Sequence, residues 1–298
     1  LITAPTFALL NAITFAYLDG EVNRFGGLRV WGTLGWIAAG WLVSLFRLDA
    51  SAAVGYLAAG SSLIAVAFTL TLPSAMPLAA PATSWADRLG LSALKLLRSR
   101  DLGVVVIVSC LFMMPLTAFY MHTPLFLDAL GVKRIAATMS VGQLTEVACL
   151  FGLGYFMRRF RLRTLLVWGI VFAILRFGLF AMADQDSMGW VLLGIGLHGL
   201  CWSLFFEVGR AFVDLRAPSA FRAQVQALVA LGTSGLGSLV GTAIVGMAYQ
   251  AFVPSGAGWS AYWWLLAAWC VLCGWGFVLV FRDDPQRQPA KACSVGGP

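Results

Sequence analysis

Two polar side chains stand three residues apart in an otherwise apolar stretch of the sequence. Gln143 and Glu146 both lie within the run 135–157, and on a helix this spacing places them on one face. Removal from water disfavours the charged form of a carboxyl group, so a carboxyl in the middle of such a run is suited to take up and release a proton. The pair indicates a proton-carrying role for Glu146. The alternative is a carboxylate that a buried Arg or Lys holds permanently.

A second group combines a histidine with aromatic rings. His198 and Trp202 are four residues apart, and Ser203 follows directly. On a helix, positions i and i+4 share a face. A nucleobase or a sugar is bound by aromatic surface together with a few hydrogen-bonding groups. These residues therefore predict a ligand contact, and the alternative is a stripe of side chains that only packs two helices together.

Four charged residues in apolar runs each leave two interpretations open. Arg29 is either an anchor at the membrane interface or a side chain that points into a helical bundle. Arg176 either extends toward the outer membrane surface or is buried with a partner. Glu207 and Arg210 are three residues apart, which favours a gate or a structural ion pair near the cytoplasmic end of their helix.

The amino-acid composition indicates the class of protein in which these residues are positioned. Of 298 residues, 60% are hydrophobic and 11% are charged, and the mean hydropathy is +0.85. Soluble domains are nearer ~45–50% apolar and ~25% charged, and disordered chains have the opposite balance, so both classes are excluded. The formal net charge of +7 is the ordinary excess of basic residues in the cytoplasmic loops of a membrane protein, and it does not indicate nucleic-acid binding.

Nine apolar runs predict nine transmembrane helices, because a helix that spans a bilayer needs about 20 apolar residues. Their hydrophobicity is continuous and does not alternate, which excludes membrane strands. The chain begins with Leu1 inside the first run, without the features of a signal peptide, so we expect that an upstream part of the protein is missing. The runs are approximately 1–18, 28–46, 51–72, 102–127, 135–157, 164–182, 189–213, 225–252 and 261–281.

The distribution of basic residues predicts the orientation. If the segment after Phe281 is cytoplasmic, alternation places on the same side the loops 19–29, 73–101, 158–163 and 214–224. Of the 20 Lys and Arg residues, the ones that then fall on the outer side are Arg47, Lys133, Arg134 and Arg176. This asymmetry agrees with the positive-inside rule and predicts a cytoplasmic C-terminus.

One connection is long and divides the chain. Residues 73–101 mix Leu with Arg and Lys after Trp85, which is typical of a short helix at the cytoplasmic interface. The predicted parts are three helices in 1–72, this linker, a six-helix bundle in 102–283 and a cytoplasmic tail in 284–298. Three helices plus six would remain if a six-plus-six transporter lost its first three.

Several stretches are specific enough for comparison with a known family. The most specific are Arg29-Val30-Trp31-Gly32-Thr33-Leu34-Gly35 and Gln143-Leu144-Thr145-Glu146. Others are Pro5-Thr6 with Asn11, Ile174-Leu175-Arg176-Phe177, His198-Gly199, and the stretch from Ala217-Pro218 through Phe221-Arg222-Ala223 to Gln226. In these residues, and over essentially its whole length, the chain resembles the nucleoside:proton symporters, which are the nucleoside permeases of the major facilitator superfamily.

The resemblance implies an all-α membrane protein of major facilitator architecture, with the last nine of the twelve family helices present. It also implies proton-coupled uptake of nucleosides across the cytoplasmic (inner) membrane, by alternating access of two bundles. Proton coupling is implied for Glu146. Substrate contacts are implied for Arg29, Thr33, Trp36, Thr117, Tyr120, Gln143, His198, Trp202 and Ser203.

Ser203 departs from the family pattern, since many members carry an Asp at this position. Either coupling runs through Glu146 alone, or the substrate differs, or transport is uncoupled. Two alternatives therefore stay open: a transporter of another small solute such as a sugar, and a membrane receptor or sensor that does not transport. The sequence contains no enzyme motif that we could identify, and it implies no cofactor, metal or protein partner. The expected partners are a nucleoside, protons and the lipid bilayer.

Overall fold

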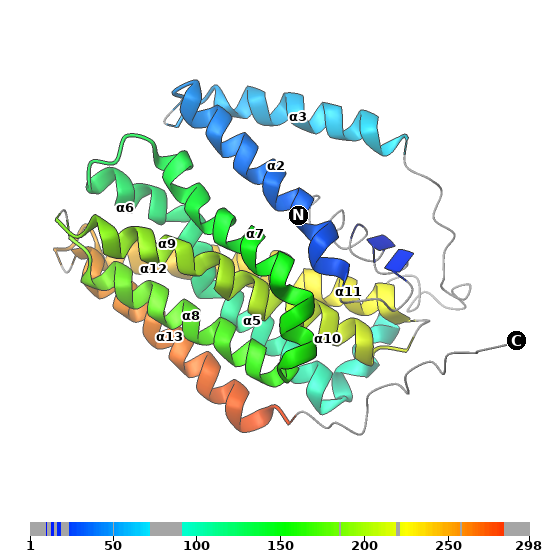
Figure 1. The fold of residues 1–298 in the computed structure, drawn as a ribbon. Coiled ribbons are helices and arrows are strands. Elements are labelled where there is room, and N and C mark those ends of the chain that lie inside the picture. The colour runs from blue at the N-terminus through cyan, green and yellow to red at the C-terminus, as the bar shows by residue number, and fades with distance from the viewer. Residues whose placement is uncertain are drawn as a thin grey trace, which may run out of the picture.

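A computed structural model shows that the elements of the described part of the chain are all helices (Figure 1). The structure describes residues 10, 13–14, 17–18, 24–49, 51–71, 91–184, 186–218, 221–256 and 258–282. The predicted first helix, 1–18, the residue Asn11, most of the linker and the tail lie largely or wholly outside these ranges.

Among the described residues, seven helices are long and apolar enough to cross a membrane. Four are single elements: Phe25–Leu45 (α2), Ile135–Arg159 (α7), Leu162–Met182 (α8) and Gly258–Val280 (α13). Three are composite: Arg100–Met121 (α5) with Thr123–Ala129 (α6); Met188–Trp202 (α9), Ser203–Glu207 (η3) and Val208–Arg216 (α10); and Arg222–Ala230 (α11), Leu231–Gly237 (η5) and Ser238–Phe252 (α12).

Two predicted segments differ from the other membrane helices. The run 51–72 contains the helix Val54–Thr69 (α3), which has 16 residues and is thus below the length of about 20 that crosses a bilayer unaided. The interfacial helix expected before Arg100 is seen as a 3₁₀ helix, Leu91–Arg98 (η2), which lies against α5 and α11. None of the residues of α3 is buried within the described structure.

The composite helices contain departures from regular α-helix at their middles. Both η3 and η5 are π-helical turns, a feature that often marks functional positions within helices. The break between α5 and α6 falls at His122, two residues before Pro124, because proline suits the first turn of a helix. Pro115, by contrast, lies inside α5 without ending it.

Six spans form one bundle. Each helix packs against the next in the spatial order α7, α9, α8, α13, α5 and α12, and α2 lies along α7 (Figure 1). Glycines bring α12 close to α5, since a Cβ on Gly241 would stand 2.6 Å from the Met114 Cα atom. Gly237, four residues earlier, faces α5 as well, since its Cβ would stand 2.9 Å from the Cys110 carbonyl oxygen, and small residues at this spacing let membrane helices approach closely.

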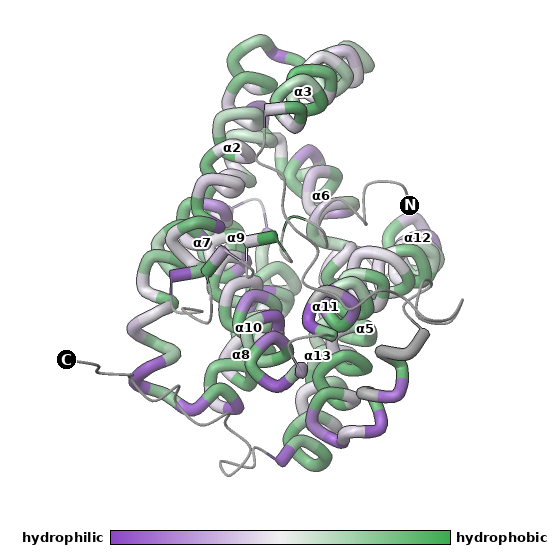
Figure 2. Tube along the Cα trace, turned by 90° about the vertical axis from the view of Figure 1, so that its right-hand side faces the viewer, coloured by the Kyte–Doolittle hydropathy of each residue, from purple (hydrophilic) through white to green (hydrophobic). Residues whose placement is uncertain are grey.

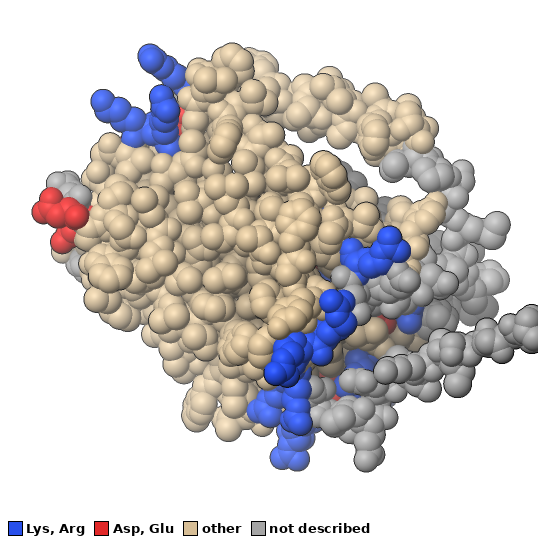
Figure 3. All heavy atoms as spheres, in the orientation of Figure 1, with Lys and Arg blue, Asp and Glu red and all other residues tan. Residues whose placement is uncertain are grey.

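The outer surface of the bundle suits a bilayer. Large apolar side chains such as Ile107, Phe151 and Leu272 are exposed, and hydrophobic residues predominate along the helices (Figure 2). On the face in Figure 3, Lys and Arg gather toward two opposite ends, with a band free of charged residues between them. α7 illustrates the spacing: its 25 residues rise about 37 Å at 1.5 Å per residue, which exceeds the ~30 Å hydrocarbon core.

Candidate functional site

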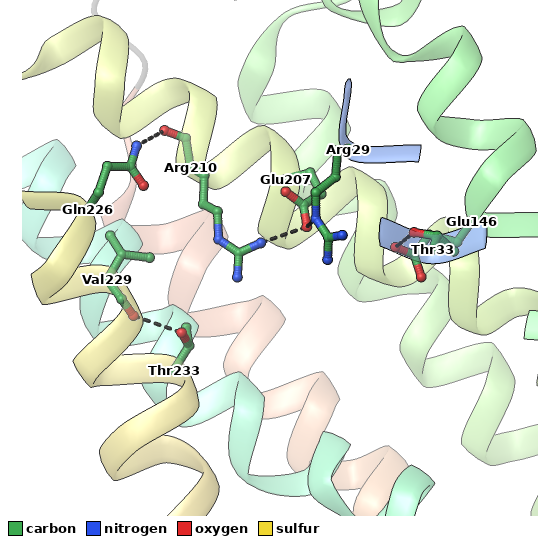
Figure 4. Close-up of polar contacts among 8 residues, drawn as sticks. All are labelled: Arg29, Thr33, Glu146, Glu207, Arg210, Gln226, Val229 and Thr233. Carbon is green, nitrogen blue, oxygen red and sulfur yellow. Dashed lines mark hydrogen bonds and ion pairs between the residues drawn. The ribbon is translucent and has the colours of Figure 1, made fainter. Parts of the chain in front are cut away.

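A buried hydrogen bond joins α2 to α7. The hydroxyl of Thr33 donates to Oε1 of Glu146 over 2.9 Å, and both side chains are buried (Figure 4). A hydroxyl can donate to a carboxylate or accept from a carboxylic acid. The same partner can therefore hold Glu146 in either protonation state, as a proton carrier requires.

A second buried carboxyl group, Glu207, lies among arginines (Figure 4). Nη1 of Arg210 donates to its Oε1 over 2.6 Å, and Nε of Arg29 lies 3.4 Å from the same oxygen. Glu207 and Arg210 come from η3 and α10, whereas Arg29 comes from α2. Because a buried charge is strongly disfavoured unless it is paired, the two guanidinium groups fix Glu207 as a carboxylate.

The two acids therefore have different surroundings. Glu146 faces a neutral hydroxyl group, while the nearby cations Arg29 and Arg210 contact Glu207. Of the two interpretations for Arg29, the structure supports the one that points into the bundle, and the Glu207–Arg210 ion pair is confirmed. The arrangement leaves Glu146 as the carboxyl better able to exchange a proton.

Aromatic rings surround an accessible tyrosine beside these acids. The Tyr120 ring centroid lies 6.0 Å from that of Trp36 and 6.5 Å from that of Trp202, both edge to face. Tyr120 and Trp36 are 37% and 59% exposed. The Tyr120 hydroxyl is 3.0 Å from Nε2 of His198. Four of the predicted ligand-binding residues thus form one cluster with accessible aromatic surface, which is what a planar ligand would stack on.

Glycines allow the helices that carry these groups to approach closely. A Cβ on Gly199 of α9 would stand 2.1 Å from the backbone nitrogen of Glu146 on α7. A Cβ on Gly142 of α7 would stand 3.2 Å from the Cβ of His198. These two glycines fix the spacing between α7 and α9, and so bring Glu146 and His198 to the same region.

Three further predicted site residues are buried. The Thr117 hydroxyl donates to the Met114 carbonyl oxygen of its own helix over 2.7 Å. Gln143 is buried, and its side-chain oxygen has no hydrogen-bond partner among the described residues. Ser203 lies on η3 and is fully buried. Like Gln143, Ser203 has a buried side-chain oxygen without a hydrogen-bond partner among the described residues, whereas the Thr117 hydroxyl group is engaged.

Sequence reasoning left the role of Arg176 undecided, and the structure resolves its position. Its side chain is fully buried, with Nη1 2.8 Å from Nδ1 of His198, so it does not extend to the membrane surface. A single cation in a long apolar run was the signal, but the partner on another helix could not be read from the run. Within the described residues, no group of three or more His, Cys, Asp or Glu could hold a metal ion.

A family model described as a nucleoside H+ symporter matches residues 1–286. The chain belongs to this family. A xanthosine permease of Escherichia coli (strain K12) is 32% identical over 309 residues, covering 97% of this chain and 74% of the permease. The nucleoside permease NupG of the same organism is 30% identical over 310 residues, covering 98% of this chain and 74% of its own length.

Solved structures agree with this nucleoside H+ symporter assignment. Two crystal structures of the nucleoside transporter NupG, one of a mutant, match with TM-scores of 0.73 and 0.68 at 28% and 29% identity. They cover 93% and 94% of this chain and 74% of the NupG chains. The prediction of an all-α, multi-pass membrane protein of major facilitator architecture is confirmed, while the number of nine helices stays a prediction.

Proposed function

We propose that this protein takes up nucleosides together with protons by alternating access. The match of residues 1–286 to the nucleoside H+ symporter family carries the proposal. The similar proteins are a xanthosine permease and a nucleoside permease, which favours a transporter over an enzyme, a sensor or a carrier of sugars.

In this proposal Glu146 carries the proton. It is buried, it contacts a hydroxyl group that tolerates both of its protonation states, and it lies on a helix that contacts α2. Ser203, at the position where many family members have an Asp, contributes no second carboxyl group. Coupling then runs through Glu146 alone, while Glu207 stays charged between its arginines.

The nucleoside is assigned to the side chains around Tyr120. Trp36 and Trp202 offer rings for stacking, and the partnerless oxygen of Gln143 accepts a hydrogen bond. Arg29, which is 25% exposed beside Glu207, offers donors to ribose or base. The less accessible predicted contacts, which are Thr33, Thr117, His198 and Ser203, line this region or support it.

The two bundles of the transporter are assigned from the chain division. Residues 1–72 belong to one bundle, 73–101 to a cytoplasmic linker, 102–283 to the other bundle and 284–298 to a cytoplasmic tail. The basic residues at 158–163 favour an inside location for that loop by the positive-inside rule, and alternation of the later helices then assigns the C-terminus to the cytoplasm. The inner membrane is assigned because the similar permeases are bacterial. A ligand and a proton drive the change of state only by binding one state better than the other.

The experiment uses bacterial cells that lack their own nucleoside uptake and express the gene that encodes this chain. Labelled uridine, adenosine and xanthosine are supplied with and without an inward proton gradient. We expect accumulation above the external concentration only with the gradient, and competition by unlabelled nucleosides but not by sugars. Normal membrane expression without uptake of any nucleoside would contradict the proposal.

A further inference from the structure

His198 connects a buried arginine to the accessible tyrosine of the proposed nucleoside site. Its Nδ1 lies 2.8 Å from Nη1 of Arg176 on α8, and its Nε2 lies 3.0 Å from the hydroxyl of Tyr120 on α5. One imidazole ring on α9 thus contacts side chains from two other helices, and both of its nitrogen atoms are engaged.

The chemistry of arginine decides the direction of both hydrogen bonds. A guanidinium group carries only donors, so Nδ1 of His198 must accept the hydrogen bond from Arg176. A neutral imidazole with an accepting Nδ1 carries its hydrogen on Nε2. Nε2 therefore donates to the Tyr120 hydroxyl oxygen. The hydrogen of the Tyr120 hydroxyl group is then free to be donated elsewhere.

Packing holds the three groups in this order. The His198 ring stacks on Phe119 with 4.0 Å between centroids and an interplanar angle of 8°. The Arg176 guanidinium carbon lies 4.9 Å from the Phe119 ring centroid and 4.5 Å from that of Phe177. Such cation–π contacts stabilise a buried guanidinium group. The fully buried Arg176 consequently cannot leave His198 without losing its contacts with the Phe119 and Phe177 rings.

We propose that Arg176 is a positioning residue that, through the tautomer of His198, makes the Tyr120 hydroxyl a hydrogen-bond donor to the substrate. The substrate atom that meets Tyr120 is then an acceptor, such as a base carbonyl oxygen or an unprotonated ring nitrogen. This inference rests on the proposed nucleoside transport. The exposed fraction of Tyr120 and its position between Trp36 and Trp202 support contact with a planar base.

The first test reads the tautomer and does not depend on transport. The protein is prepared in lipid bilayers with isotope-labelled histidine, and nitrogen NMR distinguishes a protonated from an unprotonated ring nitrogen. The His198 signals are those absent from a His198→Phe variant. We expect a hydrogen on Nε2 and none on Nδ1 in the unaltered protein, and a shift of the hydrogen toward Nδ1 in Arg176→Met. A hydrogen on Nδ1 in the unaltered protein would overturn the proposal.

The second test measures half-saturating nucleoside concentrations in the cell uptake assay. Tyr120→Phe should raise this concentration about tenfold, which is the effect of losing one hydrogen bond to an uncharged group. Arg176→Met should raise it similarly, yet add little in the Tyr120→Phe background, since both changes remove the same donor. Additive losses would show that Arg176 acts independently of the Tyr120 hydroxyl group and would overturn the proposal.

A matched control separates the chain of hydrogen bonds from Arg176 through His198 to Tyr120, here called the relay, from a general loss of charge. Arg163 lies on the same helix as Arg176, α8, near its opposite end, and donates to the Val278 carbonyl oxygen over 2.9 Å. Arg163→Met should leave the half-saturating concentration within about twofold and the tautomer unchanged. If the unaltered protein takes up no nucleoside, the proposed function fails, whereas the NMR result still decides the orientation of the relay.

Discussion

The Thr33 hydroxyl donates a hydrogen bond to the Glu146 carboxyl group across the contact between α2 and α7. These helices belong to the two different bundles of the proposed transporter. The candidate proton carrier is therefore bonded to the surface that must rearrange when the bundles move. Protonation of Glu146 changes the bond from one with a charged acceptor to one between neutral groups, and so changes how strongly α2 is held in this state.

The Thr33 contact can be removed with little change in shape. Thr33→Val should lower the proton-driven accumulation of nucleoside and the melting temperature, because a buried hydrogen bond to a charged group contributes about 1.5–3 kcal/mol. Thr33→Ser keeps the hydroxyl and should behave like the unaltered protein. Accumulation ratios and thermal melting of the purified protein measure both effects. Equal accumulation in the Val and Ser variants would show that the Thr33–Glu146 hydrogen bond does not contribute to proton coupling.

Glu207 should act as a structural anion for its two arginines. Glu207→Gln leaves Arg29 and Arg210 without their carboxylate, and breaking a buried pair in this way costs about 3–5 kcal/mol of folding free energy. Adding Arg210→Gln to this variant removes one uncompensated cation and should restore part of the loss. Thermal melting in detergent reports the effect. A Glu207→Gln protein as stable as the unaltered one would mean that the ion pairs do not hold η3.

The contact between α7 and α9 should tolerate a methyl group at one glycine and not at another. Gly199→Ala places a Cβ 2.1 Å from the Glu146 backbone nitrogen, whereas the nearest atom to a Cβ at Gly196, on the same helix, is the Thr145 Cγ2 at 3.7 Å. We expect Gly199→Ala to abolish uptake and lower the melting temperature, since backbone must move. Gly196→Ala should leave both nearly unchanged. Similar results for the two variants would argue against the observed packing of α7 on α9.

The first turn of α7 is capped by side chains from the C-terminal end of α2 and from the segment that follows it. Oδ1 of Asp49 accepts from the backbone N–H of Ala136 over 2.9 Å, and the Ser44 hydroxyl accepts from that of Ala137 over 3.0 Å. Asp49→Ala should cost about 0.5–2 kcal/mol, as loss of a helix cap does. Hydrogen exchange at the start of α7 should become faster, whereas Asp184→Ala, in an exposed loop, should not change it. Unchanged exchange in Asp49→Ala would show that this cap contributes nothing.

Hydrophobicity predicted most of the helices because it is a property of consecutive residues. The run 135–157 corresponds to Ile135–Arg159, and 164–182 corresponds to Leu162–Met182. The π-helical turn at Ser203–Glu207 was not predictable, since tertiary packing, and no local residue pattern, determines such turns. For the same reason the run 189–213 was predicted as one regular helix.

Partners across helices were the part of the site that the sequence could not supply. The spacing of Gln143 and Glu146 predicted that they share one helix face, but their neighbour Thr33 lies 113 positions before Glu146 in the chain. The two interpretations of Arg176 could be separated only by its contact with His198 on a neighbouring helix. Periodicity reports which face of a helix is polar, and tertiary packing decides what that face meets.

The most direct test of proton coupling compares Glu146→Gln with the unaltered protein in two assays on the same cells. One assay measures accumulation of labelled nucleoside driven by an inward proton gradient, and the other measures exchange of labelled for unlabelled nucleoside without a gradient. We predict that Glu146→Gln loses accumulation and keeps exchange, because Gln can fill the site but cannot release a proton. Gradient-driven accumulation that survives in Glu146→Gln would contradict the role of Glu146 as the proton carrier.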